Sequence, residues 1–264
     1  MKKEKTFSII TISYNKENEI ERTIQSVINQ SCKDFEYIVI DGKSTDDTLK
    51  VLTKYNLNID KIVSEKDDGI YDAMNKGLSF ANNNYVIYMN AGDEFDNNNV
   101  LRELKKYTSK NIDYIYSKGK IFYNDRYRIN KTKIDLKSLR QGEMPCHQCL
   151  LVKKEVLYKI GAFNTSYKIA GDFDLCCKLF QNEFKGLYLD IFIAKFYKGG
   201  LSGNYEKGFQ EIAKIVGKYF GKRYENIYRL KKLIIETNRR KLFKILKLDK
   251  LSRKLLLLFS AKKG

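Results

Sequence analysis

Acidic and amide side chains stand directly after apolar segments in the first third of the chain. Asp41 follows one such segment, and the stretch 90–94, Asn-Ala-Gly-Asp-Glu, follows another. Carboxylates at the end of a buried strand can hold a divalent metal, because hard cations prefer oxygen ligands. An Asp-x-Asp pair would be a stronger ligand set, but Asn90 stands at its first position. The stretch is therefore either a metal site with one carboxylate or a polar turn.

The elements that would position these side chains alternate between strands and helices. Apolar segments predict strands and amphipathic segments predict helices, in the order 7–13, 17–30, 35–40, 45–55, 59–63, 70–81 and 85–89. Continuous apolar strands separated by such helices predict a parallel sheet covered on both faces. Ligands of such sheets bind at the carboxyl ends of the strands, so we expect the four strand-end loops to converge. Helix capping is the alternative use of Asp46 and Asp47, which stand at a helix start.

The pattern is looser after residue 110. It predicts short strands at 112–116, 120–123, 126–129 and 149–152, an extended run at 187–196, and helices at 153–160, 172–180 and 204–219. We expect residues 1–217 to form one globular α/β domain with two halves, 1–110 and 111–217. A basic, mainly helical extension follows at 218–264.

The chain has 264 residues and a formal net charge of +18, most of which lies near its end. Residues 218–264 hold 16 Lys or Arg against 3 Asp or Glu, whereas residues 1–217 hold 34 against 29. Such a segment, with Leu, Ile and Tyr between its basic residues, predicts contact with an anionic membrane surface. A solvated tail and a helix packed on the body are alternatives. We expect no nucleic acid, because no recognition motif occurs.

Several classes of protein are disfavoured by missing motifs. No Gly-x-Gly-x-x-Gly follows the first strand, which disfavours dinucleotide-dependent dehydrogenases, and no P-loop occurs either. No signal peptide and no apolar run of roughly 18 residues occur, so we expect a cytoplasmic protein, peripheral at the inner face of the cell membrane. The five scattered cysteines are typical of a reducing compartment. The pair Cys146-x-x-Cys149 lacks the second pair that a zinc site needs, so buried thiols are favoured.

Six short motifs resemble those of the family 2 inverting glycosyltransferases with the GT-A fold, above all bacterial enzymes of capsule, exopolysaccharide and O-antigen assembly. They are Ser8-x-x-Thr-x-Ser-Tyr-Asn15, VIDGKSTDDT at 39–48, SEKDDGIYDAMNKGL at 64–78, NAGDEF at 90–95, PCHQ at 145–148 and IAGDFDL at 169–175. The resemblance covers residues 7 to about 200. It implies a Rossmann-like, mostly parallel sheet and the transfer of a sugar, with inversion, in cell-surface polysaccharide synthesis. The donor would be a nucleoside-diphosphate sugar, with UDP expected, and the acceptor a glycan, lipid-linked ones included.

The same resemblance implies roles in donor binding. The residues concerned are Thr11, Tyr14, Asn15, Asp41, Asp68, Asn75, Lys76, Asn90 and Ala91. Asp41 would accept from the base or the ribose, although many relatives carry two acids where this chain has Asp41-Gly42. Lys76 would neutralise phosphate, and His147 and Gln148 would contact the diphosphate or the acceptor. Ordinary structural uses remain open: a packed aromatic for Tyr14, a solvated charge for Lys76 and a hydrogen-bonded structural histidine for His147.

The metal and the catalytic base are also implied by the resemblance. NAGDEF lies where relatives place the Asp-x-Asp that binds Mg²⁺ or Mn²⁺, so Asp93 would be the metal ligand, helped by Asn90 or a water. Asp172 matches the base, the one carboxylate that an inverting transfer needs to take the proton of the acceptor hydroxyl. The neighbouring Asp174 would point elsewhere on a helix. The competing interpretation is a non-catalytic or nucleic-acid-binding protein on the same fold.

Overall fold

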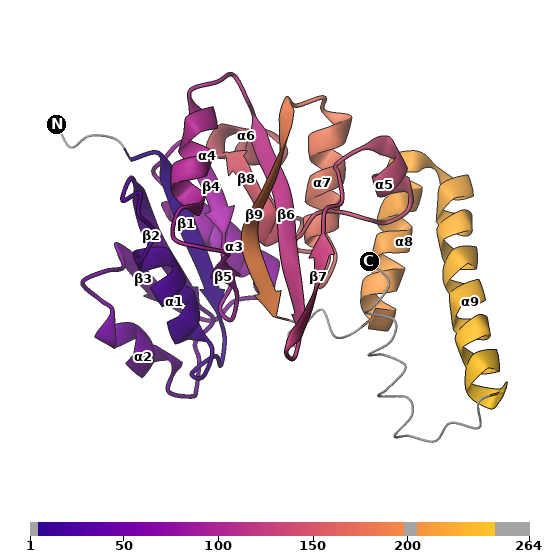
Figure 1. The fold of residues 1–264 in the computed structure, drawn as a ribbon, viewed down its shortest axis with the longest axis horizontal. Coiled ribbons are helices and arrows are strands. Elements are labelled where there is room, and N and C mark those ends of the chain that lie inside the picture. The colour runs from indigo at the N-terminus through magenta and orange to yellow at the C-terminus, as the bar shows by residue number, and fades with distance from the viewer. Residues whose placement is uncertain (1–4, 198–204, 246–264) are drawn as a thin grey trace.

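The structure is a computed structural model, and it describes residues 5–197 and 205–245. The described strands form one nine-stranded sheet in the order β3-β2-β1-β4-β8-β6-β9-β5, with β7 paired to β6 beside this path. Figure 1 shows this sheet running through the body, with helices packed against it.

The first half of the chain confirms the predicted alternation of strands and helices. Its elements are β1 (Phe7–Ser13), α1 (Ile20–Ile28), β2 (Phe35–Asp41), α2 (Thr48–Lys54), β3 (Lys61–Ser64), α3 (Ile70–Phe80) and β4 (Tyr85–Tyr88). β1 pairs in parallel with β2 and with β4, so that Phe7 lies opposite both Phe35 and Tyr85. β3 continues the parallel pairing beyond β2. The carboxyl ends of the four strands therefore lie along one edge.

The second half of the sheet is mixed: the first four strands pair in parallel throughout, and beyond them parallel and antiparallel pairs both occur. The remaining elements are β5 (Glu94–Phe95), α4 (Val100–Thr108), β6 (Tyr114–Tyr123), β7 (Arg126–Asn130), α5 (Leu136–Arg140), η1 (His147–Cys149), β8 (Leu150–Lys153), α6 (Lys154–Lys159), α7 (Gly171–Gln181), β9 (Gly186–Tyr197), α8 (Tyr205–Phe220) and α9 (Lys222–Ile245). β8 is antiparallel to β4 and to β6, whereas β9 is parallel to β6 and antiparallel to β5.

The two strands predicted at 112–116 and 120–123 are one strand, β6. The polar and glycine residues between them indicated a break, but β6 runs through them with a register shift against β9. Gly119 is needed at this point, because a Cβ there would lie 2.8 Å from the Cys149 sulfur. A shift in register thus replaces the predicted break.

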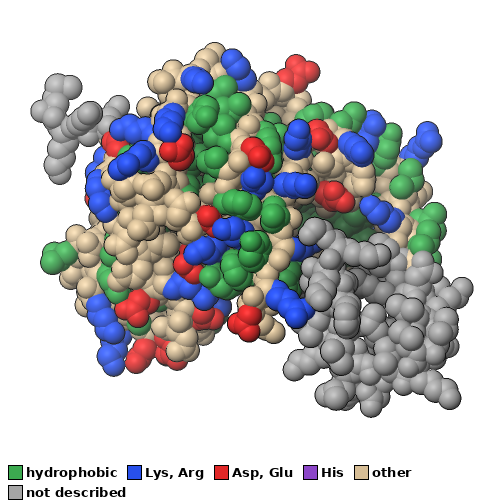
Figure 2. Space-filling model, viewed as in Figure 1, with side chains coloured by type: hydrophobic (Ala, Val, Ile, Leu, Met, Phe, Trp, Pro, Cys, Tyr) green, Lys and Arg blue, Asp and Glu red, His purple; other side chains and the backbone are tan. Residues whose placement is uncertain are grey.

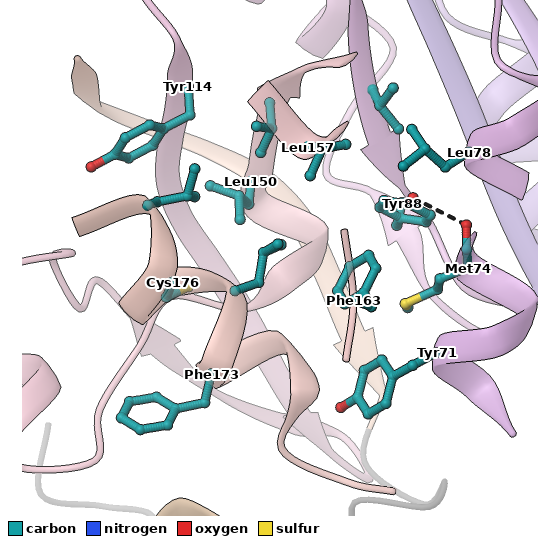
Figure 3. Packing of buried hydrophobic residues seen from close by; sticks show 14 of the residues in the cluster. Tyr71, Met74, Leu78, Tyr88, Tyr114, Leu150, Leu157, Phe163, Phe173 and Cys176 are labelled. Atoms are coloured by element: carbon teal, nitrogen blue, oxygen red, sulfur yellow. Dashed lines mark hydrogen bonds between the residues drawn. The ribbon is translucent and has the colours of Figure 1, made fainter. Parts of the chain in front are cut away.

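Alternate side chains of the strands feed two hydrophobic cores, one on each face of the sheet. In β2, Ile38 and Ile40 belong to the core that α3, α6 and α7 cover, whereas Tyr37 and Val39 belong to the core under α1 and α2. Figure 3 shows part of the first core, where Tyr88 donates a hydrogen bond to the backbone of α3.

Both predicted halves share this sheet and form one body, because β8 pairs with β4 and β5 pairs with β9. The predicted boundary at residue 217 falls inside α8, and α8 and α9 lie at the end of the molecule away from β3 (Figure 1). α9 packs on α8 through the stacked rings of Phe209 and Tyr228, whose centroids are 4.9 Å apart. Of the predicted extension, residues 246–264 lie outside the described residues. Among the described helices, none has the combination of length and apolarity needed to cross a bilayer.

Candidate active site

The loops that follow β1, β2 and β4 come together at one edge of the sheet, as the parallel pairing requires. Asn15 is the link between the first two loops. Its side-chain oxygen accepts from the Thr45 N–H at 2.8 Å, and its own N–H donates to the Ser44 hydroxyl at 2.8 Å. Asn15 has a φ of 50°, a left-handed conformation that Asn adopts more readily than most residues. The Ala91 N–H donates to the Ile12 carbonyl and brings in the loop after β4.

Asp41 lies at this edge but is turned into the protein. It is wholly buried and accepts from the Ser44 N–H at 2.9 Å and from the hydroxyls of Ser44 and Ser64 at 2.5 and 2.7 Å. Its carboxylate therefore holds the loops after β2 and β3 in place. The contact with a base or a ribose that the resemblance implies for Asp41 stays a prediction.

Tyr14, Gly42 and Asp67 form the open part of the same edge. The Tyr14 side chain is 59% exposed, so the structural alternative of a packed aromatic does not hold. A Cβ at Gly42 would lie 2.4 Å from the Asp67 carboxylate and 3.4 Å from the Tyr14 ring. The place where relatives carry a second acid is thus filled by a carboxylate from the loop after β3. Asp67 belongs to the motif at 64–78 but is not among the donor-binding residues that the resemblance implies.

Three other predicted donor-binding residues are occupied by contacts within the chain. Thr11 is wholly buried and donates to the Met89 carbonyl at 2.7 Å, so we remove it from the donor-binding set. Asn75 uses both ends of its amide on the backbone of Phe163, at 2.9 and 3.0 Å, and we remove it for the same reason. Lys76 is paired with two carboxylates, those of Glu65 at 3.1 Å and Asp72 at 3.2 Å, rather than open to phosphate.

Asn90, His147 and Asp172 form a continuous polar chain across three elements. The Asn90 amide nitrogen lies 3.1 Å from His147 Nε2, and His147 Nδ1 lies 3.5 Å from Asp172 Oδ2. With the amide donating to Nε2, the imidazole hydrogen is on Nδ1 and faces the carboxylate. His147 therefore has one close polar contact, with Asn90, and a longer contact with the open oxygen of Asp172.

Asp172 stands in the first turn of α7, where the helix dipole favours a carboxylate. Its Oδ1 accepts from the Phe173 N–H at 2.9 Å and lies 3.3 Å from the Tyr71 hydroxyl. Its Oδ2 has the long contact with His147 and no shorter one in the hydrogen bonds of the described residues. Asp172 thus has one anchored oxygen and one oxygen that is free to take a proton.

Tyr71 is the neighbour of Asp172 that the sequence analysis missed. Its hydroxyl donates to the Ile169 carbonyl at 2.6 Å, and Figure 3 shows its ring beside Phe163 at the edge of the core. Burial, and then the negative charge of Asp172, raise the pKa of Tyr71 well above its ordinary value, so the hydroxyl stays protonated. A Cβ at Gly171 would lie 2.8 Å from this ring. That close approach leaves no room for a side chain at position 171.

Asp93 lies behind these residues in a buried setting. It is 5% exposed, and its Oδ2 accepts from the Gln148 amide at 2.5 Å while its Oδ1 accepts from the Tyr197 N–H at 3.2 Å. Burial raises the pKa of Asp93 to about 6, against the opposing influence of His147 and of the Gln148 hydrogen bond. Gln148 thus contacts Asp93, while the adjacent His147 contacts Asp172.

These residues do not form a preformed site for a divalent ion. Both oxygens of Asp93 already accept hydrogen bonds, and within the described part of the chain no three His, Cys, Asp or Glu side chains gather to hold a metal. The Asn90 side-chain oxygen is buried and has no hydrogen-bond partner among the described residues. The Ser13 hydroxyl, at the carboxyl end of β1, is also buried without a partner among the described residues, so two oxygens at this edge still require one.

Comparison with known proteins agrees with this arrangement. Residues 8–186 match the model of the family described as glycosyl transferase family 2. The chain belongs to this family. A PGL/p-HBAD biosynthesis glycosyltransferase of Mycobacterium tuberculosis is 28% identical over 203 residues, which are 74% of this chain and 78% of that protein. The putative teichuronic acid biosynthesis glycosyltransferase TuaG of Bacillus subtilis is 28% identical over 47% of this chain and 50% of its own length.

Solved structures show the same fold, which confirms the predicted GT-A class. Residues 1–349 of Staphylococcus aureus TarS in complex with UDP-GlcNAc give a TM-score of 0.67 at 20% identity, over 84% of this chain and 70% of that chain. The mannosyltransferase PcManGT of Pyrobaculum calidifontis, in complex with GDP-Man and Mn²⁺, gives 0.63 at 17% identity, over 82% and 64%. A longer TarS chain has also been solved, and the present chain spans 40% of its length.

Asp93→Asn should become more stable relative to the wild type as the pH rises. Because burial raises the pKa of Asp93 from 3.8 to about 6, the folded chain binds a proton between these values that the unfolded chain has lost. The unfolding free energy of the wild type therefore falls as the pH rises through this window, whereas the Asn side chain of the variant does not titrate. The difference in unfolding free energy should change by about 2–3 kcal/mol, at about 1.4 kcal/mol per pKa unit.

The measurement is urea unfolding of both proteins at pH 4 and pH 7.5 in the presence of a chelator. Asp125→Asn, an exposed acid in the β6–β7 turn, is the control and should show no comparable change. A difference between wild type and Asp93→Asn that does not vary with pH would contradict the burial argument.

Proposed function

We propose that this chain transfers a sugar from a nucleoside diphosphate to a glycan acceptor with inversion at the anomeric carbon. The observation that carries the proposal is Asp172, held at a helix start with one oxygen anchored and the other open. UDP is the proposed nucleotide because the similar TarS structures hold UDP-GlcNAc and UDP. The acceptor is proposed to be a cell-surface glycan, since TuaG is named for teichuronic acid biosynthesis.

Asp172 is the proposed general base. An inverting transfer is a single displacement, in which the acceptor oxygen attacks the anomeric carbon and the diphosphate leaves from the opposite face. The acceptor hydroxyl loses its proton during this step, and a carboxylate within hydrogen-bond reach can take it. Oδ2 is suited to this role, because Oδ1 is anchored by the Phe173 N–H and lies against the Tyr71 hydroxyl. His147 then positions the base through its Nδ1–H.

The donor is proposed to bind at the converging strand ends. Tyr14 offers an exposed ring on which a base can stack, and Asp68 lies exposed in the adjacent loop. Asn15 and Ala91 shape this edge through the backbone contacts given above. Asn90 supplies a side-chain oxygen without a partner. Lys76 retains its proposed phosphate role if Glu65 and Asp72 release it.

Asp172→Asn should keep donor binding and lose transfer, because the amide cannot take a proton. We expect UDP release to fall by at least about 100-fold, while the dissociation constant for UDP stays within about twofold of the wild type. The assay measures UDP release over a panel of sugar nucleotides with candidate acceptors, alongside calorimetric titration of UDP. Asp125→Asn is the matched control.

Full activity of Asp172→Asn would remove Asp172 as the base. No UDP release by the wild type with any donor and acceptor would favour the alternative, a non-catalytic or nucleic-acid-binding protein on this fold.

The role of Asp93 as a ligand of Mg²⁺ or Mn²⁺ stays a prediction, and the transfer described above does not depend on it. An ion at Asp93 would use the lone pairs that the Gln148 and Tyr197 donors leave on the carboxylate, and phosphate and water would have to supply most of its other ligands. The supporting facts are the free Asn90 oxygen and the Mn²⁺ in the PcManGT complex.

Two variants should weaken the metal dependence of UDP binding to different degrees. Asp93→Ala removes the ligand and should weaken UDP binding in Mn²⁺ by at least about tenfold. Gln148→Ala removes a hydrogen bond that orients the Asp93 carboxylate and should weaken the same binding by a smaller factor. Calorimetric titration of UDP with Mn²⁺ and with a chelator measures both effects. An unchanged response to Mn²⁺ in both variants would discard the metal role.

The basic extension is proposed to bind an anionic membrane surface through α9. Four of its apolar side chains are at least half exposed: Ile227, Leu230, Leu233 and Ile234. Figure 2 shows hydrophobic side chains along the edge formed by α9, with Lys and Arg beside them. Apolar side chains flanked by basic ones suit the interface of a bilayer, where each Lys or Arg adds about 1 kcal/mol. Such contact would bring the active site to a lipid-linked acceptor.

Introducing acids on the exposed apolar face should release the protein from anionic vesicles without unfolding it. We expect the double variant Leu230→Glu/Ile234→Glu to lose most of its binding to vesicles of one part phosphatidylglycerol and three parts phosphatidylcholine. Leu57→Glu is the matched control, because Leu57 is 96% exposed in the segment between α2 and β3, two elements that lie at the end of the molecule away from α9 (Figure 1). Cosedimentation measures the bound fraction, and equal binding by the wild type and the double variant would exclude α9 as the membrane contact.

A further inference from the structure

Glu211 of α8 makes an unusual set of contacts with the segment that precedes the proposed base. Its Oε1 accepts from the Lys168 N–H at 2.9 Å, and its Oε2 accepts from the Ile169 and Ala170 N–H groups at 2.8 and 2.9 Å. Three consecutive backbone amides thus converge on one carboxylate. α8 lies beyond the residues 8–186 that the family model matches, so the family match assigns Glu211 no role.

The segment held by Glu211 has contacts on both sides of the site. The Ile169 carbonyl accepts from the Tyr71 hydroxyl at 2.6 Å, and Asp172 lies 3.3 Å from that same hydroxyl. Lys168 extends to the other side, where its ammonium group donates to the Asp68 carbonyl at 2.9 Å. A shift of this segment would therefore move both the neighbour of the base and the loop after β3.

The packing of α8 makes Glu211 a fixed point rather than a mobile surface acid. A Cβ at Gly208, one turn earlier in α8, would lie 3.1 Å from the Ile169 side chain, so helix and segment are in close contact. At the other end of α8, Lys218 and Tyr219 donate to the buried Asp174 at 3.1 and 2.9 Å. α8 is thus joined to α7 through Lys218 and Tyr219, and to the segment directly before α7 through Glu211.

We propose that Glu211 is a positioning residue for the transfer reaction. By fixing residues 168–170, it holds the Ile169 carbonyl against Tyr71 and sets the place of Asp172 at the start of α7. The inference rests on the proposed role of Asp172. It adds α8 to the machinery of the site, although no atom of Glu211 touches the reacting groups.

Glu211→Ala should loosen the segment and slow the reaction without weakening donor binding to the same degree. We expect the amides of residues 168–170 to exchange hydrogen about tenfold faster. UDP release from the donor that the wild type turns over should fall about 10- to 100-fold, because catalysis is sensitive to small misplacements of the base. The dissociation constant for UDP should change by less than about threefold. Glu211→Gln, which keeps one acceptor oxygen for Ile169 and Ala170, should recover part of the loss.

Glu206→Ala is the matched control, since Glu206 stands on the same helix and accepts from Gln210 instead of the segment. Lys168→Ala distinguishes the contact with the loop after β3 from the contacts with Glu211. It removes the hydrogen bond to the Asp68 carbonyl but keeps the three backbone N–H hydrogen bonds to Glu211. A positioning role also predicts that Glu211→Ala costs little further activity in the Asp172→Asn background. If Glu211→Ala acted only through a general loss of stability, its fold-loss in activity would multiply the fold-loss caused by Asp172→Asn.

Unchanged amide exchange in Glu211→Ala would overturn the inference, as would faster exchange with wild-type UDP release. Equal losses in Glu206→Ala, or a full further loss in the Asp172→Asn background, would also overturn it. Failure of the proposed function looks different. In that case Asp172→Asn would keep its activity, whatever Glu211→Ala does to amide exchange.

Discussion

The parallel pairing of β1 with β2 and β4 is the constraint on which the rest of the structure depends. It places the carboxyl ends of these strands along one edge, and the loops that follow are then short enough to bond to one another. Asn15 bonds the loop after β2, and Ala91 bonds the end of β1. The site is built on this edge, and the antiparallel addition of β8 next to β4 brings the PCHQ segment to it.

The acids at the site divide into two kinds according to what their oxygens contact. Asp41, Asp93 and Glu211 accept from the chain's own amides and hydroxyls, and they hold loops together. Asp172 is different, because one of its oxygens has a single long contact and its side chain is 21% exposed. A buried carboxylate with satisfied oxygens stabilises a loop, whereas one with an open oxygen can exchange a proton. The distinction supports a catalytic role for Asp172 alone among these four.

Much of the candidate site could be predicted from short motifs, because the motifs contain the residues that come into contact in the structure. Asn90, His147 and Asp172 were each singled out, and the structure joins them in one chain. The motifs did not reveal the orientation of each side chain. Thr11 and Asn75 fit the donor-binding pattern by sequence, but their side chains bond to the backbone of this chain. Polarity at a strand end shows that an oxygen needs a partner, and a sequence cannot show whether backbone or ligand provides it.

The sequence by itself determined the alternation of β1 to β4 with their helices, the family and the identity of the candidate base. These follow from local periodicity and from motifs within a few residues of one another. The tertiary structure alone decided that Tyr71 and Gly171 meet beside Asp172, that Gln148 binds Asp93, and that Glu211 holds the start of α7. Each of these contacts joins residues 40 or more positions apart, or depends on close packing of a glycine against a ring. Such contacts depend on how helices and strands pack, and local sequence patterns do not predict them.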